Sequence, residues 1–216
     1  MRIPHWIVKS ISEEDITRVE TAVSALEGVT GAEVIAIVVR RSSTVRHVFP
    51  MVLLILAVIY LLVDKMQWLP IWWGSSWHFV VEAAVLLVLG WVISSLAFVQ
   101  RLLVPKEDRV HQVEQRADLE FVENGVIATK SRVGVLLFVS LLEKRAVIKA
   151  DRGLVERIDD KVWDEILAHL SQKLKTESLS DALISTLNAM GEVLSRVFPK
   201  FPHDRNELPN DLIIKE

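Results

Sequence analysis

The stretch EVIAIVVR, residues 33–40, decides the fold of this chain. It is rich in β-branched residues and apolar almost without interruption, which is typical of a strand covered on both faces of its sheet. A lone strand leaves its edge backbone groups unpaired, and the first part of the chain offers it no partner. The next such run is VGVLLFVSLL, at residues 133–142. We therefore expect the first strand to pair with strands that follow much later in the sequence.

Helical patterns surround these two strands. Residues 12–27 predict an amphipathic helix, in which Ser12 and Asp15 form a capping-box signature. A tight turn at Glu143 and Lys144 predicts a third strand. The remaining predicted elements are helices at residues 107–123, 157–174 and 179–198 and the third strand at residues 145–150. This order favours an α/β fold, with a small mixed sheet flanked by helices.

Two long apolar stretches separate the first strand from the second. Residues 48–63 (VFPMVLLILAVIYLLV) and 83–99 (AAVLLVLGWVISSLAFV) carry no charged side chain. With their aromatic flanks, both approach the about 20 residues that a helix needs to cross about 30 Å of hydrocarbon. We predict a two-helix transmembrane hairpin at residues 47–100, with spans at about 48–67 and 78–99. It interrupts a discontinuous domain formed by residues 1–46 plus 101–216.

Basic side chains lie on both sides of the predicted hairpin, whereas a single lysine lies between its two apolar stretches. The positive-inside rule therefore predicts an integral membrane protein with both termini and the domain in the cytoplasm. The flanking cations either bind anionic lipid headgroups or serve only as topology determinants. The headgroup candidates are Arg40, Arg41, Arg46, Arg101 and Lys106.

Composition excludes several classes of function. The chain has no cysteine, which excludes disulfides and thiolate chemistry. The formal net charge is −3, and no interleaved basic and aromatic residues occur, so we expect no nucleic-acid partner. Glu82 is the one ionisable side chain near a predicted span; it is either an ion or proton ligand or a carboxylate that reaches water at the interface.

Three segments outside the predicted hairpin share the pattern of a known family. They are LEGVTGAEVIAIVVRRSS at residues 26–43, RADLEF at 116–121 followed by GVLLFVSLLEKRAVIKADRGL at 134–154, and FPKFPHDRNELPN at 198–210. In this order they resemble the TPM-domain family. The resemblance implies a TPM-like α/β sandwich. It also implies weak acid-phosphatase activity and divalent-metal binding, as in some members, or help in assembling and repairing membrane complexes, as in others.

The resemblance further implies a site for calcium or magnesium, which prefer several oxygen ligands around one point. The positions that match the family pattern are Asp151, Asp204, Asn206, Glu207 and Glu33. Two departures reduce the charge of this set, because His203 and Asn210 stand where family members carry acids. The alternative is that Asp151, Asp204 and Asn206 are only turn or cap residues.

No complete catalytic set accompanies these residues. Arg152 or Arg205 could stabilise a transferring phosphoryl group, but no phosphate-binding loop motif is present. We therefore predict a non-catalytic, membrane-anchored interaction or assembly module, whose partners are the lipid bilayer and another membrane protein or complex. The alternative is a weak divalent-metal-dependent hydrolase of the acid-phosphatase type. The sequence leaves the oligomeric state open.

Overall fold

The computed structural model describes residues 4–8, 10–42, 47–65, 78–201 and 206–216. The chain forms two compact units. The first unit combines residues 1–42 with residues 110–216, and the second comprises residues 43–109.

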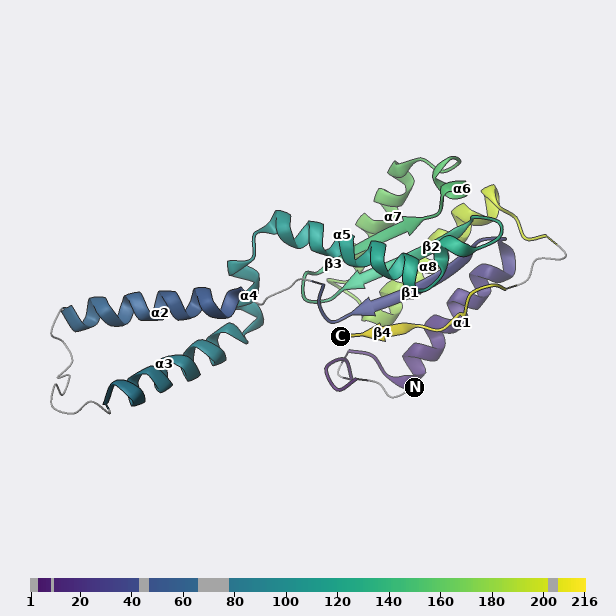
Figure 1. Ribbon diagram of the computed structural model, residues 1–216. Helices are drawn as coiled ribbons and strands as arrows, with labels where there is room; N and C mark the ends of the chain where they lie inside the picture. The colour runs from purple at the N-terminus through teal and green to yellow at the C-terminus, as the bar shows by residue number, and fades with distance from the viewer. Residues whose placement is uncertain (1–3, 9, 43–46, 66–77, 202–205) are drawn as a thin grey trace. The chain divides into compact units, whose positions relative to one another are not determined.

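A four-stranded mixed sheet lies at the centre of the first unit (Figure 1). Its strands are β1 (Glu33–Val39), β2 (Gly134–Ser140), β3 (Arg145–Ala150) and β4 (Ile213–Lys215), in the spatial order β3-β2-β1-β4. β1 runs parallel to β2, in register from Glu33 opposite Gly134 to Val39 opposite Ser140. β3 is antiparallel to β2. The predicted pairing of the first strand with strands after the apolar stretches is confirmed, as is the mixed α/β fold.

The fourth strand was not predicted. β4 pairs in parallel with β1 over three residues, with Ile213 opposite Ile37. A three-residue apolar stretch at the end of a polar tail carries no strand signal of its own. Its conformation depends on the open edge of β1, which satisfies its backbone groups.

Helices cover both faces of the sheet (Figure 1). One face is covered by α1 and α8 together with α7, and the other by α5. The bounds are α1 (Glu13–Val29), α5 (Lys106–Glu123), η1 (Val126–Ala128), α6 (Arg152–Val155), α7 (Asp160–Lys173) and α8 (Leu179–Val197). The predicted capping box starts α1: Asp15 N donates to Ser12 Oγ over 3.1 Å, and Ser12 N donates to the Asp15 carboxylate over 3.0 Å.

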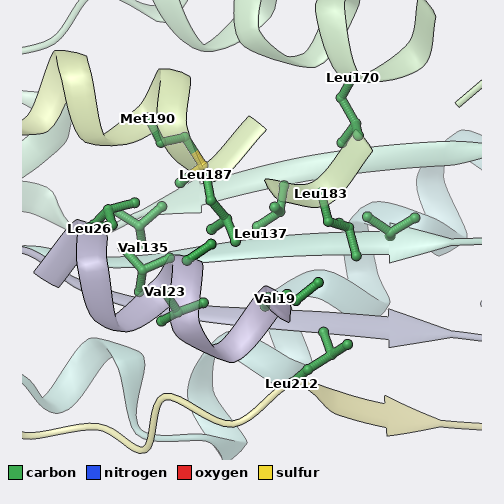
Figure 2. Packing of buried hydrophobic residues seen from close by; sticks show 14 of the residues in the cluster. Val19, Val23, Leu26, Val135, Leu137, Leu170, Leu183, Leu187, Met190 and Leu212 are labelled. Atoms are coloured by element: carbon green, nitrogen blue, oxygen red, sulfur yellow. The ribbon is translucent and has the colours of Figure 1, made fainter. Parts of the chain in front are cut away.

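The larger core lies between the sheet and the α1–α8 pair, as Figure 2 shows. Alternate residues of each strand point to opposite faces, so Val135 and Leu137 of β2 enter this core whereas Leu136 and Phe138 enter the smaller core beneath α5. Burial on both faces explains why the β1 and β2 sequences are continuously apolar. α1 and α8 pack closely where Gly191 of α8 faces Leu26 of α1.

The start of β2 requires glycine. A Cβ atom built on Gly134 would clash with the backbone oxygen of Val126, the first residue of η1. This close approach fixes η1 against the end of the sheet where β1 and β2 begin. The candidate acidic site described below lies at the same end.

The described residues of the second unit form three helices and the first turn of α5. The three helices are α2 (Val48–Lys65), α3 (His78–Ser94) and α4 (Ala97–Leu103). α2 and α3 pack closely where Gly90 faces Phe49 and Leu53. A small core of Val48, Val52 and Val104 lies among these helices.

The structure corrects the predicted second span, residues 78–99. α3 ends at Ser94, because the hydroxyls of Ser94 and Ser95 both donate to the backbone oxygen of Trp91 and compete with the helical pattern. A new helix begins at Ala97. Residues 66 and 67 of the predicted first span lie outside the described residues. Among the helices that are described, none combines the length and the apolar character needed to cross a membrane, so two full spans are not confirmed.

Candidate functional site

The α2–α3 pair exposes a broad apolar surface. Six large aliphatic side chains of α2 and eight large apolar side chains of α3 are at least 45% exposed: Leu54, Ile55, Val58, Ile59, Leu61, Leu62, Val80, Val81, Val85, Leu87, Val88, Leu89, Trp91 and Val92. Soluble proteins rarely expose contiguous apolar patches of this kind without a function in binding protein or lipid. We call this surface the apolar hairpin face.

One polar pair joins the two helices of the hairpin. Tyr60 of α2 donates its hydroxyl hydrogen to the Glu82 carboxylate of α3 over 2.7 Å. This contact gives Glu82 a structural role that was not among the two predicted ones, because it links the helices and satisfies a carboxylate among apolar neighbours. The two predicted roles, an ion or proton ligand and a carboxylate that reaches water, stay predictions.

The proposed headgroup residues are only partly described. Arg40, Arg41 and Lys106 are exposed. Arg46 and the side chain of Arg101 lie outside the described residues. Headgroup binding by these five residues therefore stays a prediction.

A small polar pocket of about 160 Å³ lies beside the start of β1. Its lining combines two carboxylates, two amides, two hydroxyls and one ammonium group, from Ser24, Glu27, Gly28, Thr30, Glu33, Lys200, Asn206 and Asn210. Glu27 and Glu33 are only 6% and 8% exposed. We call this cavity the acidic pocket.

The Glu27 carboxylate is the unusual group in the acidic pocket. Its Oε1 accepts a hydrogen bond from Val34 N over 3.0 Å, whereas its Oε2 is buried with no hydrogen-bond partner. The pKa of Glu27 is raised to about 7, chiefly by burial and also by the charge of Glu33, whereas the Val34 N–H, a hydrogen bond with Asn210 and the charge of Lys200 lower it. A carboxyl that changes charge near neutral pH is therefore held inside a polar cavity, which is typical of functional sites.

The predicted metal ligands are placed as follows. Glu33 lines the acidic pocket, and its Oε2 accepts the backbone hydrogen of Leu208 over 3.1 Å. Asn206 lines the same pocket and donates to Asn210 Oδ1. Glu207 is exposed and accepts from Lys130 N over 2.9 Å. Asp204 lies outside the described residues.

Asp151 sits at the same end of the sheet. It follows β3 directly, and its N–H donates to Gly134 O, next to the residue pair Glu33 and Gly134. Its Oδ1 accepts from Arg152 N over 2.6 Å and caps α6, as the alternative to metal binding proposed. Its Oδ2 is buried without a hydrogen-bond partner. Within the described ranges, no three acidic or histidine side chains converge as a metal site. The five-residue metal set stays a prediction.

Comparison with known proteins identifies the domain. A family model described as the TPM domain matches residues 97–193. The matched region begins at the first residue of α4 and contains β2, β3 and most of α8. The chain contains a TPM domain over this region. A comparison with curated proteins gave no match.

A solved structure supports the fold of this TPM-domain protein. The chain is similar to the NMR structure of the BA42 protein from the psychrophilic bacterium Bizionia argentinensis, with 17% sequence identity and a TM-score of 0.59. The match covers 94% of this chain and 94% of that chain. At this identity the likeness concerns the fold alone.

Three residues that line the acidic pocket were not predicted: Glu27, Ser24 and Lys200. A signal for Glu27 was available, because it follows Val23 by four residues and so lies on the apolar side of the first helix. A carboxylate on the buried face of an amphipathic helix needs a compensating environment, which predicts a polar site there.

Proposed function

We propose that the α2–α3 hairpin embeds in a lipid bilayer and holds the TPM domain at a membrane surface. The observation that carries this proposal is the apolar hairpin face, on which Leu54 and Trp91 are each 66% exposed. Moving apolar surface from water into hydrocarbon contributes about 25 cal/mol per Å². The Tyr60–Glu82 hydrogen bond supports the same environment, because it satisfies the Glu82 carboxylate without water.

Embedding does not require either helix to cross the bilayer along its described length. α2 has 18 residues and α3 has 17. At about 1.5 Å per residue each is slightly shorter than the about 30 Å of hydrocarbon in a bilayer. A hairpin inserted from one side buries the apolar face as well as one that reaches the opposite leaflet.

Flotation with lipid vesicles tests this proposal. The full chain should rise with the vesicles through a density gradient. Val58→Asp combined with Val88→Asp places a charge near the middle of each helix, on side chains that are 48% and 60% exposed. Each charge should weaken embedding by about 3 kcal/mol, because a carboxylate at this depth must be dehydrated. The double variant should therefore stay at the bottom of the gradient.

The matched control is Val122→Asp on α5, since Val122 is 58% exposed but lies outside the hairpin. It should float like the original chain. If the original chain failed to float, or if the double variant floated equally well, lipid embedding would be wrong.

We further propose that the anchored domain faces the cytoplasm and acts as a non-catalytic interaction or assembly module for another membrane protein. The basic residues around the hairpin support this sidedness, with anionic headgroups as their ligands. Because the chain has no cysteine, Ser171→Cys on the exposed side of α7 creates a single labelling site. A membrane-impermeant maleimide should label it only after the cells are opened, and labelling of intact cells would contradict the sidedness.

The acidic pocket supports a second function, the binding of a divalent cation. The residues fit such an ion, because the buried Oε2 of Glu27 has no partner in a cavity that Glu33 also lines. Glu27 and Glu33 would hold the cation, with amide oxygens of Asn206 and Asn210 as neutral ligands. The hydrolase alternative needs the same kind of ion, which would supply Lewis-acid chemistry.

Calorimetric titration of the full chain with Ca²⁺ tests the second function. Binding should be saturable, and Glu27→Gln should weaken it by at least about tenfold because one charged ligand is lost. Glu13→Gln is the matched control, since Glu13 lies on the same helix but is exposed and outside the pocket. The absence of saturable heat with both Ca²⁺ and Mg²⁺ would exclude this function.

A further inference from the structure

The C-terminal segment, residues 206–216, runs along α1 and then joins the sheet as β4 (Figure 1). We call it the C-terminal strap. The strap pairs with the sheet over three residues only. Most of its other described polar contacts are hydrogen bonds that the strap donates to side chains of the rest of the domain. These attachments are Leu208 N to Glu33 Oε2, Asn210 Nδ2 to Ser24 Oγ, Leu212 N to Glu20 Oε1 and Lys215 Nζ to Glu120 Oε2.

The strap is also a wall of the acidic pocket. Asn206 and Asn210 line the cavity from the strap, while Glu27 and Glu33 line it from the end of α1 and the start of β1. Two strap attachments, those to Glu33 and Ser24, are made on pocket residues themselves. A change in the occupancy of the pocket therefore acts on residues that hold the strap.

Asn210 of the strap lies within hydrogen-bonding reach of the Glu27 carboxylate, and this contact lowers the pKa of Glu27. Asn206 donates to Asn210, and Glu27 Oε2 is buried without a partner. Hard cations gather oxygen ligands from separate chain segments around one point. An ion in this pocket would add its own bonds to carboxylate and amide oxygens to the contacts that already join the strap to α1.

We propose that cation binding in the acidic pocket fastens the C-terminal strap onto α1 and onto the edge of β1. This inference rests on the second proposed function, because it assigns a regulatory consequence to the same site. The strap is then a cation-controlled latch, and its release uncovers the pocket and the β1 edge that β4 occupies. Binding and closure stabilise each other, since coupling between two equilibria is reciprocal.

Hydrogen–deuterium exchange of the full chain tests the latch. Backbone amides of the strap exchange when it lifts, and a ligand that binds only the closed form slows this exchange by the factor 1 + [L]/Kd. With free Ca²⁺ at ten times the Kd found by calorimetry, exchange in residues 206–216 should slow about elevenfold. Exchange in the β2–β3 hairpin, which lies outside the strap, serves as an internal reference.

Three variants sharpen the result. Glu27→Gln should abolish the Ca²⁺-dependent slowing, and Glu13→Gln should retain it. Asn210→Ala, on the partly buried strap, removes a strap oxygen while the main-chain bonds of Leu208 and Leu212 remain, so it should lose most of the slowing even if Glu27→Gln fails to fold.

The outcomes separate the two proposals. Saturable Ca²⁺ binding with unchanged strap exchange would overturn the latch and leave the cation site standing. No binding of Ca²⁺ or Mg²⁺ would overturn both. Slowing that survives Glu27→Gln and Asn210→Ala alike would place the ion elsewhere and would also overturn the latch.

Discussion

At the scale of single residues, Glu27 is the side chain whose environment departs most from that of an ordinary surface acid. Its carboxylate is 6% exposed, and one of its oxygens has no hydrogen-bond partner. Burial is the first cause of its raised pKa, and the nearby charge of Glu33 adds to it. The folded domain therefore holds a proton that the unfolded chain releases at lower pH.

This raised pKa predicts a pH-dependent stability. Between pH 4.5 and about 7 the unfolded chain loses the proton of Glu27 whereas the folded chain keeps it, so the free energy of unfolding should fall as the pH rises. One pKa unit corresponds to about 1.4 kcal/mol, which gives a decrease of about 2 to 3 kcal/mol between pH 5 and pH 8. Urea unfolding of the full chain, followed by circular dichroism, measures it.

Glu27→Gln is the control for this prediction. It should remove the decrease in the free energy of unfolding that the titration of Glu27 causes between pH 5 and pH 8. Three acids with lowered pKa values, Asp15, Glu120 and Asp181, do not interfere, since their stabilisation is lost only as the pH falls below the usual carboxyl range. A slope that is identical in the original chain and in Glu27→Gln would show that Glu27 does not titrate as its burial requires.

The sequence could predict only some of the site residues. Glu33 was predicted because it begins a strand in a family-like segment, and it does line the pocket. Asn206 was predicted from the same resemblance and lines it as well. Glu27 was not predicted. The helical periodicity of residues 12–27 identified the apolar residues of the buried face, and Glu27 is a charged residue on that same face. Asp204 stays a prediction.

At the scale of elements, β4 depends on an ion pair at its end. Lys215 contacts the Glu120 carboxylate, which is fully buried, and also approaches the half-exposed Glu123 at 3.8 Å. Burial alone would raise the pKa of Glu120, but hydrogen bonds from Lys215 and Asn124 and the charges of Lys215 and Arg116 hold it below the usual value. These contacts compensate for the short register of β4.

The two acids around Lys215 predict unequal mutational effects. Glu120→Gln breaks a buried ion pair and should lower the free energy of unfolding by about 3 kcal/mol, because it leaves Lys215 and Arg116 without the negative charge that they share. Glu123→Gln removes only an exposed contact and should cost less than about 1 kcal/mol. Urea unfolding compares the two. Equal losses would mean that the Glu120 pair does not hold β4 to the sheet.

The elements that the sequence predicted well are those with strong local signals. β1 and β2 are continuously apolar, and α1 carries a complete capping box, so both strands and the start of the helix follow from local residues. The break between α3 and α4 was not predicted. The prediction rested on apolar composition, which takes no account of the hydroxyls of Ser94 and Ser95 that donate to the backbone oxygen of Trp91. β4 was missed because its pairing comes from the edge of β1.

At the scale of the whole molecule, one chain combines a TPM domain with a helical hairpin of a different surface chemistry. The two central strands, β1 and β2, bury all their apolar side chains, whereas α2 and α3 leave most of theirs exposed. We propose that two compact units with such different surfaces lie in two different solvents. The central claim about the molecule is that lipid surrounds the apolar hairpin face.

Trp91 offers the most direct test of this claim, since it lies in α3 and is 66% exposed on the apolar hairpin face. The measurement is the tryptophan fluorescence of the full chain in vesicles of brominated and of ordinary lipid, because bromine on the acyl chains quenches only indoles that enter the hydrocarbon. The account predicts a clear loss of fluorescence in the brominated vesicles that becomes smaller in Trp91→Phe. Equal fluorescence of the original chain in the two kinds of vesicle would contradict it.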